Sequence, residues 1–182
     1  MTGSEPVDVD PVDVEPAPAA PAASARRRVG LPITLGVAAL VVLLDQLTKN
    51  WAINALSDGR ARHVIWTLQW NLTFNSGMAF SRGQGVGLYI GAVALVVVVM
   101  LIVASRKSQD RRSTIALGLI IGGALGNLVD RLFRGSGWLH GHVIDFIDMR
   151  WWPVFNVADM GVSIGGVLMV LFALFESRPA RS

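Results

Sequence analysis

Aspartate is the residue best suited to chemistry in this chain, and five aspartates border its long apolar runs. They are Asp45, Asp130, Asp145, Asp148 and Asp159. A carboxylate at membrane depth is costly to desolvate, so such residues usually face the protein interior and indicate a functional site. Asp145 has apolar neighbours on both sides, in the stretch Val143-Ile144-Asp145-Phe146-Ile147, which argues against a solvated surface acid. The set predicts chemistry that uses carboxylates near one membrane interface.

Structural explanations compete with this functional one. Asp45 and Lys49 are four residues apart, the spacing of a simple ion pair at a helix end. Asn156 and Asp159 have the spacing of a helix N-cap and a first-turn acid, which the helix dipole favours. Asp145 could still be an ordinary loop acid. The residues alone therefore leave both explanations open.

The pattern Asn-x-x-Asp occurs twice, as Asn127 to Asp130 and as Asn156 to Asp159. Residues three apart share one face of a helix, so each amide can orient a carboxylate. Asp130 also precedes Arg131, and these two could be interfacial charges that merely end a span. The repeated pattern favours a functional site.

Four apolar runs must position these residues. A helix needs about 20 residues to span a bilayer. The first run extends from Val29 to Leu44 and, with the residues to Thr48, is long enough; no A-x-A cleavage site follows it, which favours an anchored helix over a signal peptide. The other three lie between Arg82 and Arg106, between Arg112 and Asp130, and from about Val154 to Phe175. We predict an all-α membrane protein with four transmembrane helices in residues 29–176.

Glycines at four-residue spacing mark two of these runs. The third carries Gly118, Gly122 and Gly126, and the fourth carries Gly161 and Gly165. Small residues at this spacing let membrane helices pack closely. Such packing would bring the acid-bearing helix ends together.

Basic residues predict the orientation. They cluster before the first run, in the short connection after the second and beyond the fourth, as Arg26, Arg27, Arg28, Arg106, Lys107, Arg111, Arg112, Arg178 and Arg181. All of these lie on one side of a four-span protein, and that side is cytoplasmic by the positive-inside rule. Both termini are then cytoplasmic, and residues 49–86 and 130–155 lie outside.

Composition excludes several classes of protein. The chain has 182 residues, 52% of them hydrophobic and 16% charged, against about 25% charged in an ordinary soluble domain. With no cysteine it has no disulfide, thiolate metal site or Cys nucleophile. The net charge of +3 is too small to indicate nucleic acid. Residues 1–28 read as a disordered, acidic, Pro/Ala-rich cytoplasmic tail ending in the arginine cluster, and residues 177–182 as a short cytoplasmic tail.

The first outer loop predicts some β-structure. Apolar and polar residues alternate from Val64 to Phe74, which is typical of one or two short strands. Four tryptophans are expected to form an aromatic belt at the membrane surface: Trp66, Trp70, Trp151 and Trp152. Three histidines lack metal-ligand spacing, so no metal is predicted: His63, His140 and His142.

Five ordered motifs resemble those of the bacterial lipoprotein signal peptidase (signal peptidase II) family of membrane aspartic proteases. They are Asp45-Gln46-Leu47-Thr48-Lys49, Asn75-Ser76-Gly77-Met78-Ala79-Phe80-Ser81, Gly126-Asn127-Leu128-Val129-Asp130-Arg131, Val143-Ile144-Asp145-Phe146 and Phe155-Asn156-Val157-Ala158-Asp159. The resemblance covers roughly residues 30–176. The family often has Thr-Gly-Ala where this chain has Ser76-Gly77-Met78, and the segment between Asp145 and Asp159 is somewhat short.

The resemblance implies an intramembrane aspartic endopeptidase. Its substrates would be prolipoproteins, cut N-terminal to a diacylglyceryl-modified cysteine, with Asp145 and Asp159 as the catalytic pair. Two close carboxylates can share one proton, so the ionised one can take a proton from water while the protonated one polarises the scissile carbonyl. No metal or organic cofactor is needed. The implied location is the bacterial cell membrane, with the active site at its outer face.

Supporting roles also follow from the resemblance. Arg131 and Asn75 would hold the substrate backbone, and Asn127 and Asn156 would orient the aspartates. Asp45 and Lys49 would support the end of the first helix, while Asp130 would pair with Arg131 or brace the loop. Membrane lipids and the prolipoprotein are the expected partners, and no oligomer is implied.

Two other classes remain as alternatives. A proton-coupled transporter also places carboxylates in a helix bundle, but commonly near mid-membrane and within internal repeats. A non-enzymatic membrane scaffold would use the acids only as caps and ion pairs. The location of the carboxylates at one interface argues against the transporter, and a scaffold should keep its function when Asp145 or Asp159 is replaced by Asn.

Overall fold

A computed structural model describes residues 30–76, 86–106, 110–135 and 137–176. Its elements are α1 (Gly30–Ala55), β1 (Arg62–Ile65), β2 (Leu68–Asn75), α2 (Val86–Ser105), α3 (Arg111–Phe133), β3 (Val143–Asp148) and α4 (Val157–Glu176). The predicted tails, residues 1–28 and 177–182, lie outside the described residues. So do the motif residues 77–81 and the basic residue Lys107.

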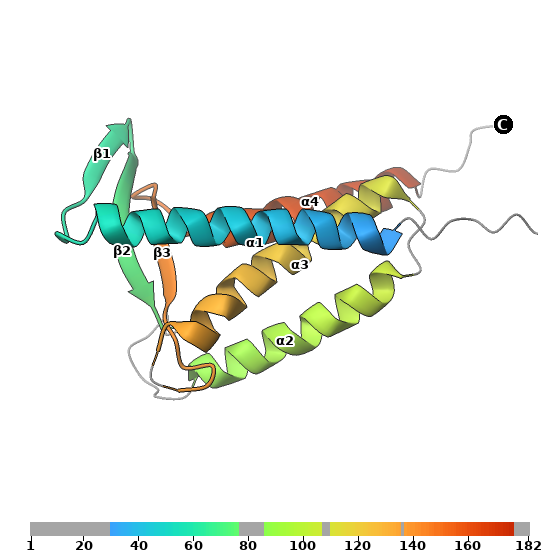
Figure 1. Ribbon diagram of the computed structural model, residues 1–182. Coiled ribbons are helices and arrows are strands. Elements are labelled where there is room, and N and C mark those ends of the chain that lie inside the picture. The colour runs from blue at the N-terminus through green and yellow to red at the C-terminus, as the bar shows by residue number, and fades with distance from the viewer. Residues whose placement is uncertain (1–29, 77–85, 107–109, 136, 177–182) are drawn as a thin grey trace, which may run out of the picture.

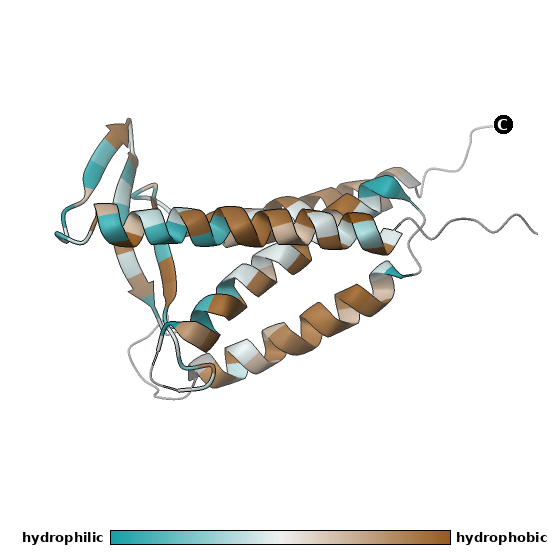
Figure 2. Cartoon of the chain, in the orientation of Figure 1, coloured by the Kyte–Doolittle hydropathy of each residue, from teal (hydrophilic) through white to brown (hydrophobic). Residues whose placement is uncertain are grey.

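Within the described part of the chain, four helices are long and apolar enough to cross a membrane. Their outward faces carry exposed aliphatic side chains, and Figure 2 shows α2 as apolar along most of its length. This confirms the predicted four-span fold. Two helices are longer than predicted, since α1 continues past Thr48 to Ala55 and α3 continues past Asp130 to Phe133. Their polar residues are buried against protein, so they do not end the helices.

Helix α3 is the centre of the bundle and packs against α1, α2 and α4 (Figure 1). Glycines allow the closest approaches. A Cβ on Gly122 would lie 2.8 Å from the carbonyl oxygen of Ala38, so no larger residue fits against α1 there. Gly123, on the neighbouring face, meets the backbone of α4 at Ala158. The predicted glycine packing therefore uses two faces of α3, one for α1 and one for α4.

A three-stranded antiparallel sheet in the order β1-β2-β3 lies across one end of the bundle, called here the sheet end (Figure 1). Strands β1 and β2 confirm the β-structure predicted between Val64 and Phe74. Strand β3 was missed, because its first four residues are buried on both faces and so lack the alternating pattern of a half-exposed strand. Asp145 therefore lies in a strand and not in a loop, and it pairs with Thr73 of β2.

An aromatic cluster attaches the sheet to the end of α1. Trp70 of β2 contacts Phe146 of β3 and Trp51 of α1, with ring centroids 6.1 Å and 5.6 Å away. Trp70 is thus only partly accessible, unlike the other three tryptophans of the expected belt, Trp66, Trp151 and Trp152, which are all exposed. The cluster fixes β3, and with it Asp145, relative to the helices.

Candidate active site

Asp145 is almost fully buried, with 2% of its surface exposed, and its carboxylate accepts two hydrogen bonds. The side-chain amide of Asn75 donates to its Oδ2 at 2.9 Å, and that of Asn156 donates to its Oδ1 at 2.7 Å. Burial raises the pKa of Asp145 to about 6; the Asn75 bond opposes this rise, and the charge of Asp159 adds to it. The carboxyl is therefore poised to change its protonation near neutral pH.

Asp159 lies in the first turn of α4, where Asn156 caps the helix. The Asp159 backbone N–H donates to Asn156 Oδ1 at 2.9 Å, and the Asn156 N–H donates to Asp159 Oδ2 at 3.1 Å. This reciprocal pair is a capping box, as the structural explanation of these residues supposed. The same Asn156 also donates to Asp145, so the cap is at the same time a link between two carboxylates.

Asn127 of α3 completes that link. Its Nδ2 donates to Asp159 Oδ1 at 2.7 Å, while its Oδ1 accepts from Asn156 at 3.1 Å and from Lys49 Nζ at 2.9 Å. A lysine ammonium can only donate, so the Asn127 carbonyl must face Lys49 and its amide must face Asp159. Two asparagines thus join Asp145 to Asp159 by a continuous path of hydrogen bonds.

A buried ion triad lies behind the asparagines. Lys49 Nζ is 2.8 Å from Asp45 Oδ2 and 2.8 Å from Asp130 Oδ2, and all three side chains are fully buried. Asp45 also accepts from the backbone N–H of Ala158 at 2.9 Å. Asp130 accepts from the N–H of Ile144 at 3.1 Å. The triad therefore holds the backbone on the N-terminal side of both Asp145 and Asp159.

Asp130 was expected either to pair with Arg131 or to brace the loop. It forms ion pairs with Lys49 and with Arg134 Nε, the latter at 2.8 Å, and the structure gives it none with the neighbouring Arg131. Side chains three or four apart on a helix meet, whereas adjacent ones point apart. It also accepts a hydrogen bond from the Ile144 N–H, in the segment that carries Asp145.

Two residues of this network were missed by the sequence analysis. Gln46 Nε2 donates to Asp130 Oδ1 at 3.0 Å, and Arg134 Nη2 donates to Gln46 Oε1 at 3.2 Å. The spacing of Arg134 from Asp130 was a usable signal, since it is an i,i+4 pair. Gln46 gave no such signal, because Asp130 and Arg134 are distant from it in the sequence, at and just beyond the end of α3.

Arg131 points its guanidinium toward the same region. Its Nη1 donates to the Asn127 carbonyl at 3.3 Å. Its Nε is buried and meets no hydrogen-bond partner in the part of the chain that the structure describes. A buried donor of this kind is costly unless a further acceptor, such as a bound carbonyl, satisfies it.

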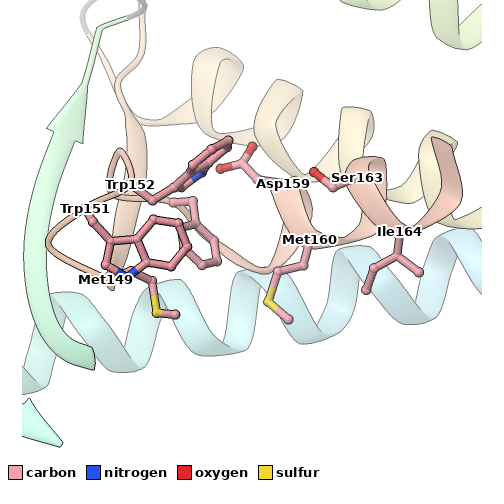
Figure 3. Close-up of a pocket in the computed structure, with 8 residues that line it drawn as sticks. Met149, Trp151, Trp152, Asp159, Met160, Ser163 and Ile164 are labelled. Carbon is pink, nitrogen blue, oxygen red and sulfur yellow. The ribbon is translucent and has the colours of Figure 1, made fainter. Parts of the chain in front are cut away.

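A pocket of about 480 Å³ adjoins Asp159 (Figure 3). Its walls are mainly apolar and include Trp151, Trp152, Phe155, Met160 and Ile164. Figure 3 shows the Asp159 carboxylate between Trp152 and Ser163. One carboxylate of the linked pair is therefore accessible from an apolar cavity.

The histidines lie apart from this network. His63 Nε2 is 2.9 Å from the carbonyl oxygen of Trp66, and His140 Nδ1 is 2.7 Å from that of Trp138. Within residues 30–76, 86–106, 110–135 and 137–176, no group of three or more His, Asp or Glu side chains is arranged to hold a metal ion. The side chains that form the network are carboxylates, amides, the Lys49 ammonium and the guanidinium groups of Arg131 and Arg134.

The sequence model of the family described as Signal peptidase (SPase) II matches residues 37–175. The chain belongs to the signal peptidase II family. The match spans all nine residues predicted from the motifs, from Asp45 to Asp159. Family membership and the four apolar helices together make the chain a multi-pass membrane protein.

Relatives with this family's name are similar over most of the chain. The lipoprotein signal peptidase of Mycolicibacterium smegmatis is 46% identical over 154 residues, which are 84% of this chain and 65% of that protein. The chain thus spans slightly less than two thirds of that relative's length. The lipoprotein signal peptidase of Mycobacterium leprae is 42% identical over 80% of this chain and 73% of its own length.

Solved structures share the fold. A bacterial membrane enzyme determined by the in meso method at 1.9 Å resolution superposes with a TM-score of 0.70 and 27% sequence identity. The superposition covers 81% of this chain and 95% of that one. This chain therefore shares its overall fold with a solved bacterial membrane enzyme.

Proposed function

We propose that this protein is a lipoprotein signal peptidase that cleaves prolipoproteins N-terminal to a diacylglyceryl-modified cysteine. Asp145 and Asp159 are its catalytic pair. The observation that carries the proposal is the hydrogen-bonded path Asp145–Asn156–Asn127–Asp159, which ends at an apolar pocket on a membrane-spanning helix. Family membership supports the reaction, and the geometry supports the choice of residues.

The reaction needs one proton shared between the two carboxylates. The raised pKa of Asp145 favours such sharing, since both groups cannot easily ionise side by side. The ionised carboxylate takes a proton from a water molecule, whose oxygen attacks the scissile carbonyl carbon. The protonated carboxyl donates to the carbonyl oxygen, forming a tetrahedral diol. Collapse of the diol breaks the C–N bond, and the leaving nitrogen receives a proton from the pair. The shared proton belongs to the pair rather than to one residue.

Arg131 and Asn75 are proposed to hold the substrate backbone. Arg131 has a buried Nε with no partner in the described structure, so a substrate carbonyl would satisfy it. Asn75 ends β2 and is exposed while its amide reaches Asp145. A peptide lying along this part of the sheet would pass close to the carboxyl pair.

The sheet end is proposed to face the outside of the bacterial cell membrane. Arg106, Arg111 and Arg112 lie at the opposite end of the bundle, where α2 and α3 are connected (Figure 1). Basic residues in short loops mark the cytoplasmic side of the membrane. Both termini are then cytoplasmic, and the carboxyl pair lies at the outer interface, where water and the substrate's scissile bond can both reach it.

The test uses the purified protein in detergent and one synthetic prolipoprotein peptide in two forms. One form carries diacylglycerol on its cysteine and the other has an unmodified cysteine. We expect cleavage of the lipidated form alone, with the new N-terminus at the cysteine by mass spectrometry and with no effect of a chelator. Cleavage elsewhere in the peptide, or equal cleavage of both forms, would contradict the proposed substrate.

The alternatives weighed from the sequence are less consistent with these findings. A transporter would hold its carboxylates near the middle of the spans, whereas here they gather at the sheet end. A scaffold would use Asp145 only in structural bonds, yet a buried carboxyl with a pKa near 6 weakens a structure at neutral pH. Both classes also disagree with membership of a peptidase family.

A further inference from the structure

Two apolar grooves of similar size border α4 below the sheet. The tryptophan groove is the pocket of about 480 Å³ between Trp151, Trp152, Met160 and Ile164, with Asp159 at one end (Figure 3). The second, here called the α2 groove, has about 460 Å³ and lies between α2, α3 and α4. Its walls include Val93, Ala94 and Val97 of α2, Ala124 of α3 and Val162 of α4.

The two grooves lie on opposite sides of Asp159. Successive residues of an α-helix turn by about 100°, so Met160, Ser163 and Ile164 follow one side of Asp159. Val162, three residues after Asp159, lies about 60° from Asp159 around the helix axis, on the side away from Met160. Ala124 is one turn of α3 before Asn127, which donates to Asp159. Both grooves therefore begin at, or one helical turn below, the same carboxylate.

The lining indicates a hydrocarbon occupant. Among the described residues that line the α2 groove none is charged, and Tyr89 is the one polar residue. The tryptophan groove has Asp159 and Ser163 as its polar lining residues. Met160, Ile164 and Val93 are 42%, 48% and 63% exposed on helices that span the membrane, so both grooves open toward lipid chains. An apolar chain can enter either groove sideways without crossing water.

We propose that the two grooves hold the two acyl chains of the substrate's diacylglyceryl group, one on each side of α4. The inference rests on the proposed function and adds to it the residues that bind the lipid. A ligand with two chains joined at one end fits two grooves that lie on either side of Asp159 and start within one helical turn of it. Placed this way, the modified cysteine and the bond before it lie over the carboxyl pair. A bilayer phospholipid shares this chemistry, but only the substrate joins such chains to a peptide bond.

The experiment compares two lipidated peptides of identical sequence, one carrying dipalmitoyl glycerol and the other diacetyl glycerol. Ile164→Trp fills the tryptophan groove, and Ala94→Phe fills the α2 groove. Leu43→Trp is the matched control, since Leu43 is an exposed residue of α1 that lines neither groove. The quantity measured is the ratio of kcat/KM for the long-chain substrate to that for the short-chain substrate. This ratio cancels any difference in the fraction of active protein.

We expect the wild-type ratio to exceed about 10 and each filled variant to lower it at least about threefold, mainly through a higher KM. The Leu43→Trp variant should keep the wild-type ratio. Filled variants that both keep the wild-type ratio would overturn the inference while leaving the peptidase activity in place. A fall in only one of them would overturn the arrangement of one chain in each groove. A wild type that cleaves neither peptide would refute the proposed function itself, and this inference with it.

Discussion

Asp130 accepts a hydrogen bond at 3.1 Å from the backbone N–H of Ile144, the residue directly before Asp145. Asp45 accepts the equivalent bond at 2.9 Å from Ala158, the residue directly before Asp159. Lys49 lies 2.8 Å from both of these acids. One buried ammonium thus connects the supports of the two carboxylates, which lie on separate elements of the fold.

Replacing Lys49 with methionine tests this support. The change leaves Asp45 and Asp130 buried without their cation, and breaking a buried ion pair costs about 3–5 kcal/mol. We expect a lower unfolding temperature in detergent together with loss of cleavage. Arg62→Met is the matched control, because the Arg62–Asp58 pair is 3.5 Å long and half exposed. That control should change stability by no more than about 1 kcal/mol. Equal unfolding temperatures for the two variants would contradict the role of Lys49.

Asn127 should matter more for rate than for binding. Asn127→Leu removes the donor to Asp159 and the acceptor of Lys49 while keeping a similar volume. A hydrogen bond to a charged group is worth about 1.5–3 kcal/mol, so kcat should fall about tenfold to hundredfold with a smaller change in KM. Asn71→Leu serves as the control, since Asn71 donates to Asp148 and not to the carboxyl pair. A change confined to KM would show that Asn127 acts on substrate binding instead.

The pH dependence of stability should report the burial of Asp145. Its pKa lies near 3.8 in the unfolded chain and is raised by burial to about 6 in the folded protein. The unfolded state therefore loses this proton first as pH rises, so the contribution of the neutral carboxyl is complete below 3.8 and is lost by about pH 6. We expect the unfolding temperature of wild type, relative to Asp145→Asn, to fall across that window. A difference that is constant, or that grows with pH, would contradict the burial of this group.

Asn75 should tune the protonation of the pair. Its amide donates to Asp145 Oδ2 and so favours the ionised carboxylate, which lowers the pKa of Asp145 against the effect of burial. The Asn75→Ala variant lacks this hydrogen bond, so it no longer lowers the pKa of Asp145. We expect the alkaline limb of the profile of kcat/KM against pH to move to higher pH, besides any loss of rate. A limb that stays in place or moves to lower pH would show that Asn75 does not act on Asp145.

Much of this arrangement could be predicted from local sequence patterns. Hydrophobic runs predicted the four spans, and alternation predicted β1 and β2. Strand β3 escaped because a strand buried on both faces has no alternation to detect. The Asp45–Lys49 pair was readable as an i,i+4 contact within one helix. The link from Lys49 to Asp130 was not, since it joins α1 to α3 and depends on how closely the glycines let these helices approach.

Asp145 and Asp159 are proposed to act together on the scissile bond, and three amide substitutions test this joint action. Asp145→Asn and Asp159→Asn are compared with Asp148→Asn in single-turnover cleavage of the lipidated peptide. Asp148 lies on the same strand as Asp145 but bonds to Gln69 at 2.7 Å and to Asn71 at 3.0 Å, away from the pair. We expect both pair variants to fold yet lose cleavage by at least about a thousandfold, while Asp148→Asn keeps measurable cleavage. Cleavage that survives in folded Asp145→Asn or Asp159→Asn would show that these two carboxylates are not the catalytic pair.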